Sequence, residues 1–259
     1  MRDYLLFRLY GALASWGDIA VGDIRPSYRY PSKSAVVGLI AAALGVERQA
    51  HEKQSELTKL VFSVRIDGVG VSIDDYHTVQ APSEQAIKHD RGRAYWTRLD
   101  EIEAIKLRVI SSQSSAEAGA IQSRRTYYCD AVHTVALSEK NHNRINWNVF
   151  KITELKDITC IAGFLKKPRF TLYLGRKSCP LGLPLEPQII PAENCSEAFQ
   201  KSEFKFAYEL EFIIGQETAQ YYSEEISEKS KMKLMRRDQP VNRATWQFTE
   251  RDEYYFQEW

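Results

Sequence analysis

The sequence predicts an α+β fold whose strands and helices follow one another in the order βαββαβ, the ferredoxin-like arrangement. Three observations lead to this prediction. The chain opens with a dense apolar run at Tyr4–Tyr10 and continues into a helical apolar pattern at 36–44. Two strand-like runs, a helical stretch and a last alternating run complete the order before residue 187. A long excursion at about 82–123 interrupts this unit, and residues 188–259 are expected to form a β-rich extension packed on it.

The composition is that of a soluble globular protein, with 44% hydrophobic and 27% charged residues in a chain of 259. Because its 35 basic and 34 acidic residues nearly balance, a nucleic-acid-binding surface would have to be a local patch. Cys129, Cys160, Cys179 and Cys195 form no CxxC pair, so we expect reduced thiols rather than zinc or disulfides. We see no signal peptide and no apolar run long enough for a bilayer, so we expect a cytoplasmic protein without a membrane partner.

The first strand and the first helix have clear limits. Tyr4–Tyr10 is apolar enough to be a central strand. Ser32 or Ser34 can cap the helix that follows, whose apolar residues surround most of its circumference, and Gly45 is suited to end it. A second, short amphipathic helix is predicted over His51–Leu60.

A β-hairpin is predicted next. Leu60–Ile66 has the pattern of a strand, Asp67-Gly68 is a strong turn signal, and Val69–Val79 is expected to return as the partner strand. Regular structure resumes at Tyr127–Leu137 after the excursion.

The second half of the unit is predicted from a helix at Trp147–Gly163 and a strand at Phe170–Leu174, where apolar and polar residues alternate. β-branched residues make the helix less favourable. In the extension, Phe204–Ile214 is expected to be a strand. A basic segment at 229–237 and an alternating aromatic tail at 245–259 follow.

Basic residues surround the predicted strand at 170–174. The window 166–184 holds five basic residues and no acid. These are Lys166, Lys167, Arg169, Arg176 and Lys177. Gly175 would let a ligand approach the backbone, and the Arg and Lys side chains beside it, with Ser178, suit phosphate groups. A solvated strand end without a ligand is the alternative.

A second basic patch lies in the excursion, in the sequence KHDRGRAYWTR. Its four cations outnumber its single acid, and two aromatic residues stand among them. These six residues are Lys88, Arg91, Arg93, Tyr95, Trp96 and Arg98. Cations that follow a phosphate backbone and aromatics that stack on bases suit single-stranded nucleic acid. A merely soluble loop is the alternative.

Catalytic motifs are sparse. His77 and His133 could act as acid or base on a ribose hydroxyl, but neither has an evident partner in the sequence. The string from Gly175 to Ser178 echoes the end of a P-loop, but the upstream glycine of that motif is missing. HExxH, GxSxG and carboxylate clusters with metal spacing do not occur. We therefore expect no catalytic site, no metal and no cofactor.

An ordered series of short motifs extends over nearly the whole chain. They are Trp16-Gly17, Arg25-Pro26, Tyr30–Ser34, Gly38-Leu39, Leu44-Gly45, Asp75–Val79, Arg125–Ala131, Tyr173–Leu181, Arg237-Asp238 with Pro240, and Gln247-Phe248. By this series the chain resembles the Cas5 family of CRISPR-associated proteins, and within it the type I-E form.

The resemblance implies a RAMP-type protein with a ferredoxin-like palm, at 1–187, and a β-hairpin thumb at about 82–123. It also implies a non-catalytic subunit of the Cascade surveillance complex in antiviral defence. Such a subunit holds the 5′ handle of the crRNA and caps the Cas7 backbone next to the Cas8e large subunit. It meets target DNA only through the complex. The excursion stands where the family has its thumb and is longer than the typical one.

The expected RNA-binding residues combine family-motif positions with the two basic patches. They are Arg25, Tyr30, Lys33, Ser34, His77, Lys88, Arg91, Arg93, Tyr95, Trp96, Arg98, Arg124, Arg125, Lys167, Arg169, Gly175, Arg176, Lys177 and Ser178.

Two other functions remain open. One is an endoribonuclease that processes precursor crRNA, as in the related type I-C subunit. The type I-E motifs argue against it, since those systems use a separate Cas6 subunit. The other is an RRM-like RNA chaperone acting alone, but residues 62–65 and 127–133 lack the RNP-type submotifs that it would need.

Overall fold

The computed structural model describes residues 1–82, 97–103, 118–140, 142–204, 214, 219–242, 245 and 247–258. The chain separates into two compact units. The first, which we call the sheet unit, comprises Met1–Asp18, Ser27–Ile73 and Tyr127–Trp259. The second, the ribbon unit, comprises Ile19–Pro26 and Asp74–Thr126. In the described part of the chain, no helix is long and apolar enough to cross a bilayer.

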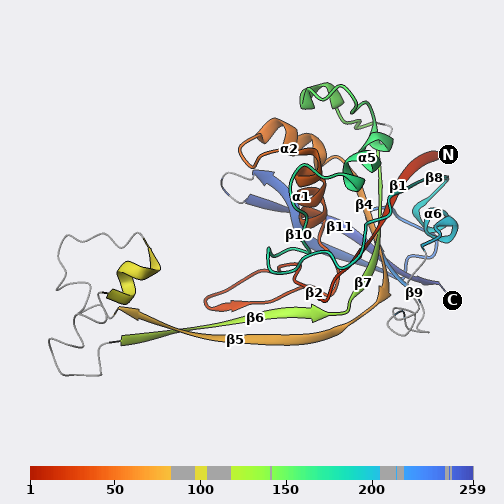
Figure 1. Ribbon diagram of the computed structural model, residues 1–259. Coiled ribbons are helices and arrows are strands. Elements are labelled where there is room, and N and C mark those ends of the chain that lie inside the picture. The colour runs from red at the N-terminus through yellow and green to blue at the C-terminus, as the bar shows by residue number, and fades with distance from the viewer. Residues whose placement is uncertain are drawn as a thin grey trace. The chain divides into compact units, whose positions relative to one another are not determined.

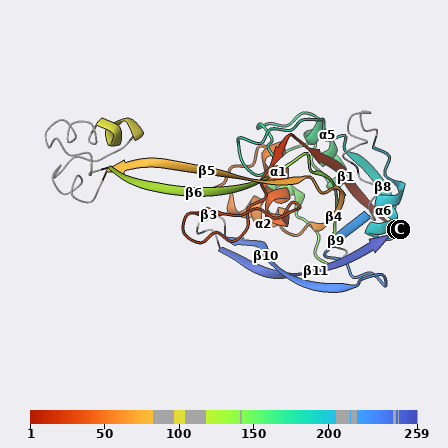
Figure 2. The same ribbon diagram turned by 90° about the horizontal axis from the view of Figure 1, so that it is seen from below.

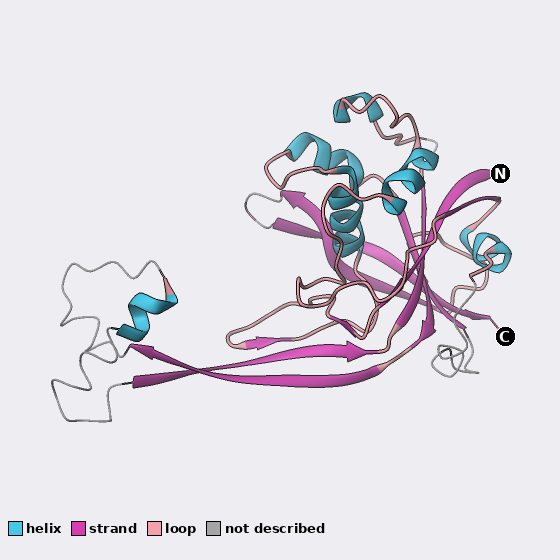
Figure 3. Cartoon of the chain, in the orientation of Figure 1, coloured by secondary structure: helices cyan, strands magenta, loops and turns pink. Residues whose placement is uncertain are grey.

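A seven-stranded antiparallel sheet forms the centre of the sheet unit, in the order β10-β11-β9-β4-β7-β1-β8 (Figure 1). The strands are β1 (Arg2–Tyr10), β4 (Val61–Gly68), β7 (Val132–Ser138), β8 (Gln188–Ala192), β9 (Ala219–Ser223), β10 (Met232–Asn242) and β11 (Gln247–Glu258). A large antiparallel sheet combined with helices agrees with the predicted α+β class (Figure 3). Strands β8–β11, all after residue 187, join the same sheet as β1, β4 and β7.

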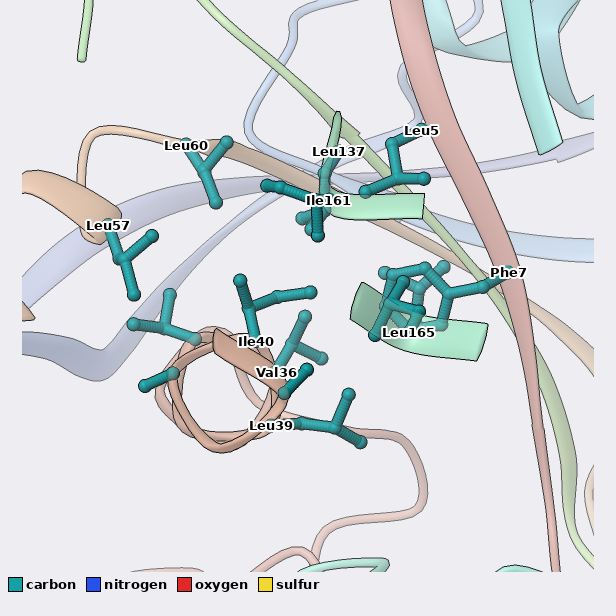
Figure 4. Close-up of a cluster of buried hydrophobic side chains, with 14 of the residues drawn as sticks. Leu5, Phe7, Val36, Leu39, Ile40, Leu57, Leu60, Leu137, Ile161 and Leu165 are labelled. Carbon is teal, nitrogen blue, oxygen red and sulfur yellow. The ribbon is translucent and has the colours of Figure 1, made fainter. Parts of the chain in front are cut away.

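Helix α1 (Lys33–Leu44) has the ends predicted from the sequence. The Ser32 side chain accepts a hydrogen bond from the Ala35 amide, and Gly45 ends the helix in a left-handed conformation with a φ of 72°. Figure 4 shows Val36 and Ile40 of this helix in the same buried cluster as Leu57, Ile161 and Leu165. These partners belong to α2 (His51–Leu57) and α5 (Ile161–Lys166), which pack with α1 on one side of the sheet.

The two faces of the sheet bury separate clusters, as alternate residues of β1 show. Leu5 and Phe7 join the cluster beneath α1, whereas Tyr4 and Leu6 pack on the opposite face together with α6 (Cys195–Lys201). A strand that is buried on both faces has a continuous apolar sequence. This is why the opening strand could be predicted as a central one.

The predicted hairpin between 60–66 and 69–79 is wrong. β4 pairs with β7 and β9, whereas β5 (Val71–Pro82) pairs with β6 (Ala118–Cys129). The strand that returns beside β4 is therefore β7, and both strands β5 and β6 are inserted between them.

The turn predicted at Asp67-Gly68 is wrong as well, because both residues lie within β4. The Asp67 carboxylate accepts hydrogen bonds from Arg65 Nε at 2.5 Å and from Thr134 Oγ1 at 2.6 Å, and its side chain is only 7% exposed. The strand ends at Gly68, and Gly70 then has a φ of 70°. Contacts with a distant strand therefore override the local turn preference.

Phe170–Leu174 does not form the predicted last strand. These residues lie in an irregular segment in which an isolated bridge joins Tyr173 to Pro180. The alternating pattern has another cause, since Leu172 and Leu174 are buried in the core while Phe170 is 48% exposed. The strand that pairs with β1 on the side opposite β7 is β8.

The predicted helix at 147–163 is broken into short pieces. Two 3-10 turns, Trp147–Phe150 and Ile158–Cys160, precede α5. Asp157 caps the second turn, because its side chain accepts hydrogen bonds from the Thr159 and Cys160 amides. The predicted strand at 204–214 lies, apart from its two end residues, outside the described residues.

In the ribbon unit, β5 and β6 run in opposite directions, and β3 (Ile24–Arg25) pairs in parallel with β6 (Figure 2). A short helical segment covers 98–103. In this unit, none of the residues 19–26, 74–79, 81, 97–103 and 121–126, whose side chains the structure describes, is buried. In the sheet unit, β2 (Leu13–Ala14) pairs with the end of β6 at Tyr128 and Cys129.

Candidate nucleic-acid interface

The loop at 174–179 presents two of the predicted cations on a closed turn of the sheet unit. The Leu174 amide donates to the Cys179 carbonyl oxygen at 2.7 Å, and the Cys179 amide donates to the Arg176 carbonyl oxygen at 2.9 Å. The Cys179 side chain is fully buried beneath the turn, whereas Lys177 and Ser178 are exposed. The loop is therefore anchored on its inner side and carries charge on its outer side.

Gly175 allows this loop to lie against the segment that follows β1. Its φ is 86°, and a Cβ there would lie 1.8 Å from the Ser15 carbonyl oxygen. The Ser15 amide in turn donates to the Leu174 carbonyl oxygen at 3.1 Å. The close approach that the sequence predicts at this glycine is thus made by the chain's own backbone.

A Gly175→Ala variant should be less stable than the natural protein. The positive φ alone costs about 1–3 kcal/mol for a residue with a Cβ, and the collision with Ser15 adds to it. Gly17→Ala is the matched control, because Gly17 has a φ of 59° but no atom within 4 Å of a built Cβ. Denaturant unfolding of both variants measures the difference. Equal losses of stability in the two variants would show that the contact between residue 175 and the Ser15 carbonyl oxygen adds no destabilisation.

Arg176 is half-buried, and its guanidinium carbon lies 4.8 Å from the centroid of the Tyr127 ring. This is a cation–π distance, and Tyr127 itself is only 8% exposed. The sequence analysis did not identify this aromatic partner, because Tyr127 lies 49 positions before Arg176 in the sequence. The loop thus combines a guanidinium held against a ring with the exposed ammonium of Lys177.

Two further predicted cations, Lys167 and Arg169, are exposed ahead of the loop. The Arg169 amide donates to the Ala43 carbonyl oxygen at 3.0 Å, and its guanidinium carbon lies 5.5 Å from the centroid of the Phe164 ring. Because the window 166–184 contains no acid, this part of the sheet unit is suited to bind a polyanion.

The ribbon unit carries a separate group of exposed arginines, Arg25, Arg124 and Arg125, where β3 meets β6. Arg25 stands opposite Arg125 in the parallel pair, and Arg124 Nε lies 4.0 Å from Asp74 Oδ2. Arg25 Nη1 donates to the carbonyl oxygen of Gly22. Guanidinium groups that are gathered in this way suit phosphate oxygens.

His77 is half-exposed on β5, and its Nε2 lies 3.2 Å from Asp75 Oδ1. The pair gives His77 a carboxylate partner that the sequence analysis did not identify. The signal was available, because residues two apart on a strand point to the same face.

The structure buries Tyr30 and Lys33, so we leave both out of the interface. Tyr30 is 7% exposed, and its hydroxyl donates to Glu253 Oε2 at 2.7 Å. Lys33 is 4% exposed, and its Nζ donates to both Glu224 oxygens at 2.9 and 3.0 Å. Ser34 is half-buried, with its Oγ 3.1 Å from Ser32 Oγ.

Tyr30 and Lys33 belong to a buried ionic cluster that joins α1 to β10 and β11. Its cations are Lys33, Arg236 and Arg251, and its carboxylates are Glu224, Asp238 and Glu253. Arg251 donates to Asp238 through Nε at 2.6 Å and Nη2 at 3.0 Å. Asp238 also accepts from the Lys33 amide at 2.7 Å. Several of the family-motif residues therefore have a structural role.

The remaining predicted residues belong to the excursion. Lys88, Arg91, Arg93, Tyr95 and Trp96 lie outside the described residues. Arg98 is described, and its Nη1 lies 2.5 Å from Glu101 Oε2 on the same helical turn. Among the described residues of the chain, no group of three or more His, Cys, Asp or Glu side chains could hold a metal ion.

His133 is fully buried in β7, where its Nε2 lies 2.9 Å from the Arg29 carbonyl oxygen. Burial lowers its pKa from 6.5 to about 4. The folded protein therefore keeps this ring neutral at pH values at which the unfolded chain binds a proton. Its contribution to stability is full above pH 6.5 and is lost as the pH falls towards 4. A buried neutral ring of this kind is not available to a substrate.

A His133→Gln variant should have a flatter dependence of stability on pH. In the natural protein, His133 binds a proton only in the unfolded chain when the pH falls from 7 to 5. This protonation alone should lower the free energy of unfolding by about 2 kcal/mol. Urea unfolding at both pH values measures it, with His51→Gln as control, because His51 is exposed. If the two variants lost the same stability on acidification, burial of His133 would not be the cause.

Comparison with known proteins finds similarity to CRISPR-associated proteins. A family model described as CRISPR-associated protein (Cas_Cas5) matches residues 4–253. The CRISPR system Cascade subunit CasD of Escherichia coli (strain K12) is 31% identical over 263 residues, which cover 98% of this chain and 96% of that protein.

Solved structures agree with this at the level of the fold. A chain of a CRISPR RNA-guided surveillance complex matches with a TM-score of 0.59 and 20% identity, over 98% of this chain and 89% of that one. A crystal structure of a Cas protein matches with a TM-score of 0.53 and 25% identity, over 98% and 93%.

Proposed function

Because the chain belongs to the Cas5 family of CRISPR-associated proteins, we propose that it is the CasD-type subunit of a type I-E Cascade complex and binds crRNA without cleaving it. The observation that carries this proposal is the closed loop at 174–179. It presents Arg176 and Lys177 in a window that contains five basic residues and no acid.

The arrangement of strands supports a ferredoxin-like palm. β4, β7, β1 and β8 are consecutive in the sheet, with α1 between β1 and β4 in the chain. This is the neighbour order of a βαββαβ unit whose central hairpin connection has been enlarged. The palm would include β8 and so extend beyond the boundary at residue 187, and the pair β5 and β6 would form the thumb.

In this account, the 174–179 loop contacts phosphates at the 5′ handle of the crRNA, together with Lys167 and Arg169. The arginines at 25, 124 and 125, and Arg98, provide a second set of cations in the ribbon unit. The subunit would cap the Cas7 backbone beside the Cas8e large subunit and meet target DNA only through the complex. Such an assembly would act in antiviral defence in the cytoplasm.

A processing endoribonuclease is the second candidate, and the His77–Asp75 pair is the observation that favours it. A general base in RNA cleavage has to take a proton from a 2′-hydroxyl, and a carboxylate can orient an imidazole for that role. The other histidine of interest, His133, is buried and neutral.

We expect the full-length protein to bind labelled repeat RNA and to leave it intact, with or without a divalent cation. A gel shift and a denaturing gel of the same mixture measure binding and cleavage together. Cleavage that disappears in His77→Ala but not in His51→Ala would replace this proposal by the endoribonuclease. Absence of binding at low salt would contradict it directly.

A further inference from the structure

A groove of about 680 Å³ lies in the sheet unit beside the 174–179 loop. Its wall comes from the segment that enters the loop and from the segment that leaves it. Leu172 and Pro180, which flank the loop, therefore also line the groove. Leucines, prolines and Phe170 make up most of the wall.

Phe170 is an exposed aromatic ring on a fixed backbone. The side chain is 48% exposed although it lines the groove. Its amide donates to the Ala42 carbonyl oxygen at 3.1 Å, and the preceding amide of Arg169 donates to Ala43 at 3.0 Å. These bonds tie the segment to carbonyl groups in the last turn of α1, where the Ala42 carbonyl oxygen also accepts a hydrogen bond from the Gly45 amide. The ring thus loses little backbone freedom when it stacks on a ligand.

The charges around the groove favour an anionic ligand. Lys166 and Arg169 line it and are exposed. Glu186 lines it too, but this carboxylate accepts a hydrogen bond at 2.7 Å from Arg8 Nη2, whose side chain is 4% exposed. The negative charge of Glu186 is therefore compensated by a buried guanidinium, and the groove keeps the two exposed cations among its lining residues.

We propose that the groove binds one unpaired nucleobase of the RNA held at the 174–179 loop, with the base stacked on Phe170. This inference rests on the proposed function, because the RNA would reach the groove from the loop. Stacking on an aromatic side chain suits every base, since each has a π-face. The mostly apolar wall offers stacking rather than hydrogen-bond readout, so we expect little preference among the four bases.

The test measures affinity of the full-length protein for single-stranded RNA from the 5′ end of the crRNA, by fluorescence anisotropy. Phe170→Ala should bind about 5- to 150-fold more weakly, which is the range for loss of one stacked base. Phe170→Tyr keeps the ring and should bind like the natural protein, whereas Phe170→Leu should bind like the alanine variant. Ile226→Ala is the control, because Ile226 is also an exposed apolar residue of the sheet unit but does not line the groove.

Abasic substitutions along the same RNA identify the stacked nucleotide. One position should weaken binding to the natural protein and have no further effect on Phe170→Ala. Unchanged affinity of Phe170→Ala, with binding still lost when Arg176 and Lys177 are reversed, would overturn the groove proposal and leave the proposed function intact. A Phe170→Ala protein that binds RNA normally but fails to enter the complex would also overturn it, in favour of a protein partner. If neither set of changes affects RNA affinity, both proposals fail.

Discussion

Replacement of Asp238 by Asn should lower the free energy of unfolding by about 3–5 kcal/mol, which is typical when one partner of a buried ion pair is removed. Asp238 is 5% exposed and accepts two hydrogen bonds from Arg251 and one from the Lys33 amide. An amide of the same shape cannot balance the buried guanidinium. Because α1 and the strands β10 and β11 meet at this cluster, the loss should affect the whole sheet unit.

Asp252→Asn provides the matched control for this change. Asp252 lies on β11 and pairs with Lys233 at 2.9 Å, but its side chain is 49% exposed. Exposed pairs contribute about 0–1 kcal/mol, so the control should unfold almost like the natural protein. Denaturant unfolding of both variants, monitored by circular dichroism, gives the comparison. A loss of stability in Asp238→Asn no larger than in the control would contradict a structural role for the ionic cluster.

Reversal of both loop charges, in Arg176→Glu/Lys177→Glu, should weaken binding of the crRNA handle by roughly 2–4 kcal/mol. Two charge-assisted phosphate contacts would be lost together. Fewer counterions would then be released on binding, so the dependence of affinity on salt should become less steep. Affinity measured at two salt concentrations tests both effects.

Lys229→Glu/Lys231→Glu is the control with the same change in net charge, since both lysines are exposed in the segment that leads into β10. It should alter the affinity only slightly. An unchanged salt dependence in the loop variant, or equal effects of the two double variants, would mean that the 174–179 loop is an ordinary solvated loop.

The parts of the fold that local sequence signals specify could be predicted. α1 is an example, because its N-cap at Ser32 and its C-terminal glycine at Gly45 act within one turn of the helix. Asp67-Gly68 shows the limit of such signals. Asp67 in β4 accepts a hydrogen bond from Thr134, which lies 67 residues further along the chain. No local sequence pattern predicts this partner.

In the candidate site too, some features could be predicted from local sequence and others could not. The charge of the 174–179 loop is visible as a run of cations without acids. Tyr30 and Lys33 look equally suited to bind RNA. Yet the Tyr30 hydroxyl donates a hydrogen bond to Glu253 and Lys33 forms an ion pair with Glu224, and these partners lie 223 and 191 positions further along the chain. The groove beside Phe170 could not be foreseen either. It depends on where two separated, proline-containing segments meet, and the alternating pattern around Phe170 instead suggested a strand.

Cross-linking within the assembled complex tests the central claim most directly. A crRNA with photoreactive thiouridine in its 5′ handle is bound by the complete Cascade complex and irradiated, and the cross-linked peptides are identified by mass spectrometry. We predict cross-links from this subunit at residues 167–178, and their loss in Arg176→Glu/Lys177→Glu. Handle cross-links confined to other surfaces of the chain, such as the basic segment at 229–237, would contradict the assignment of the RNA-binding loop.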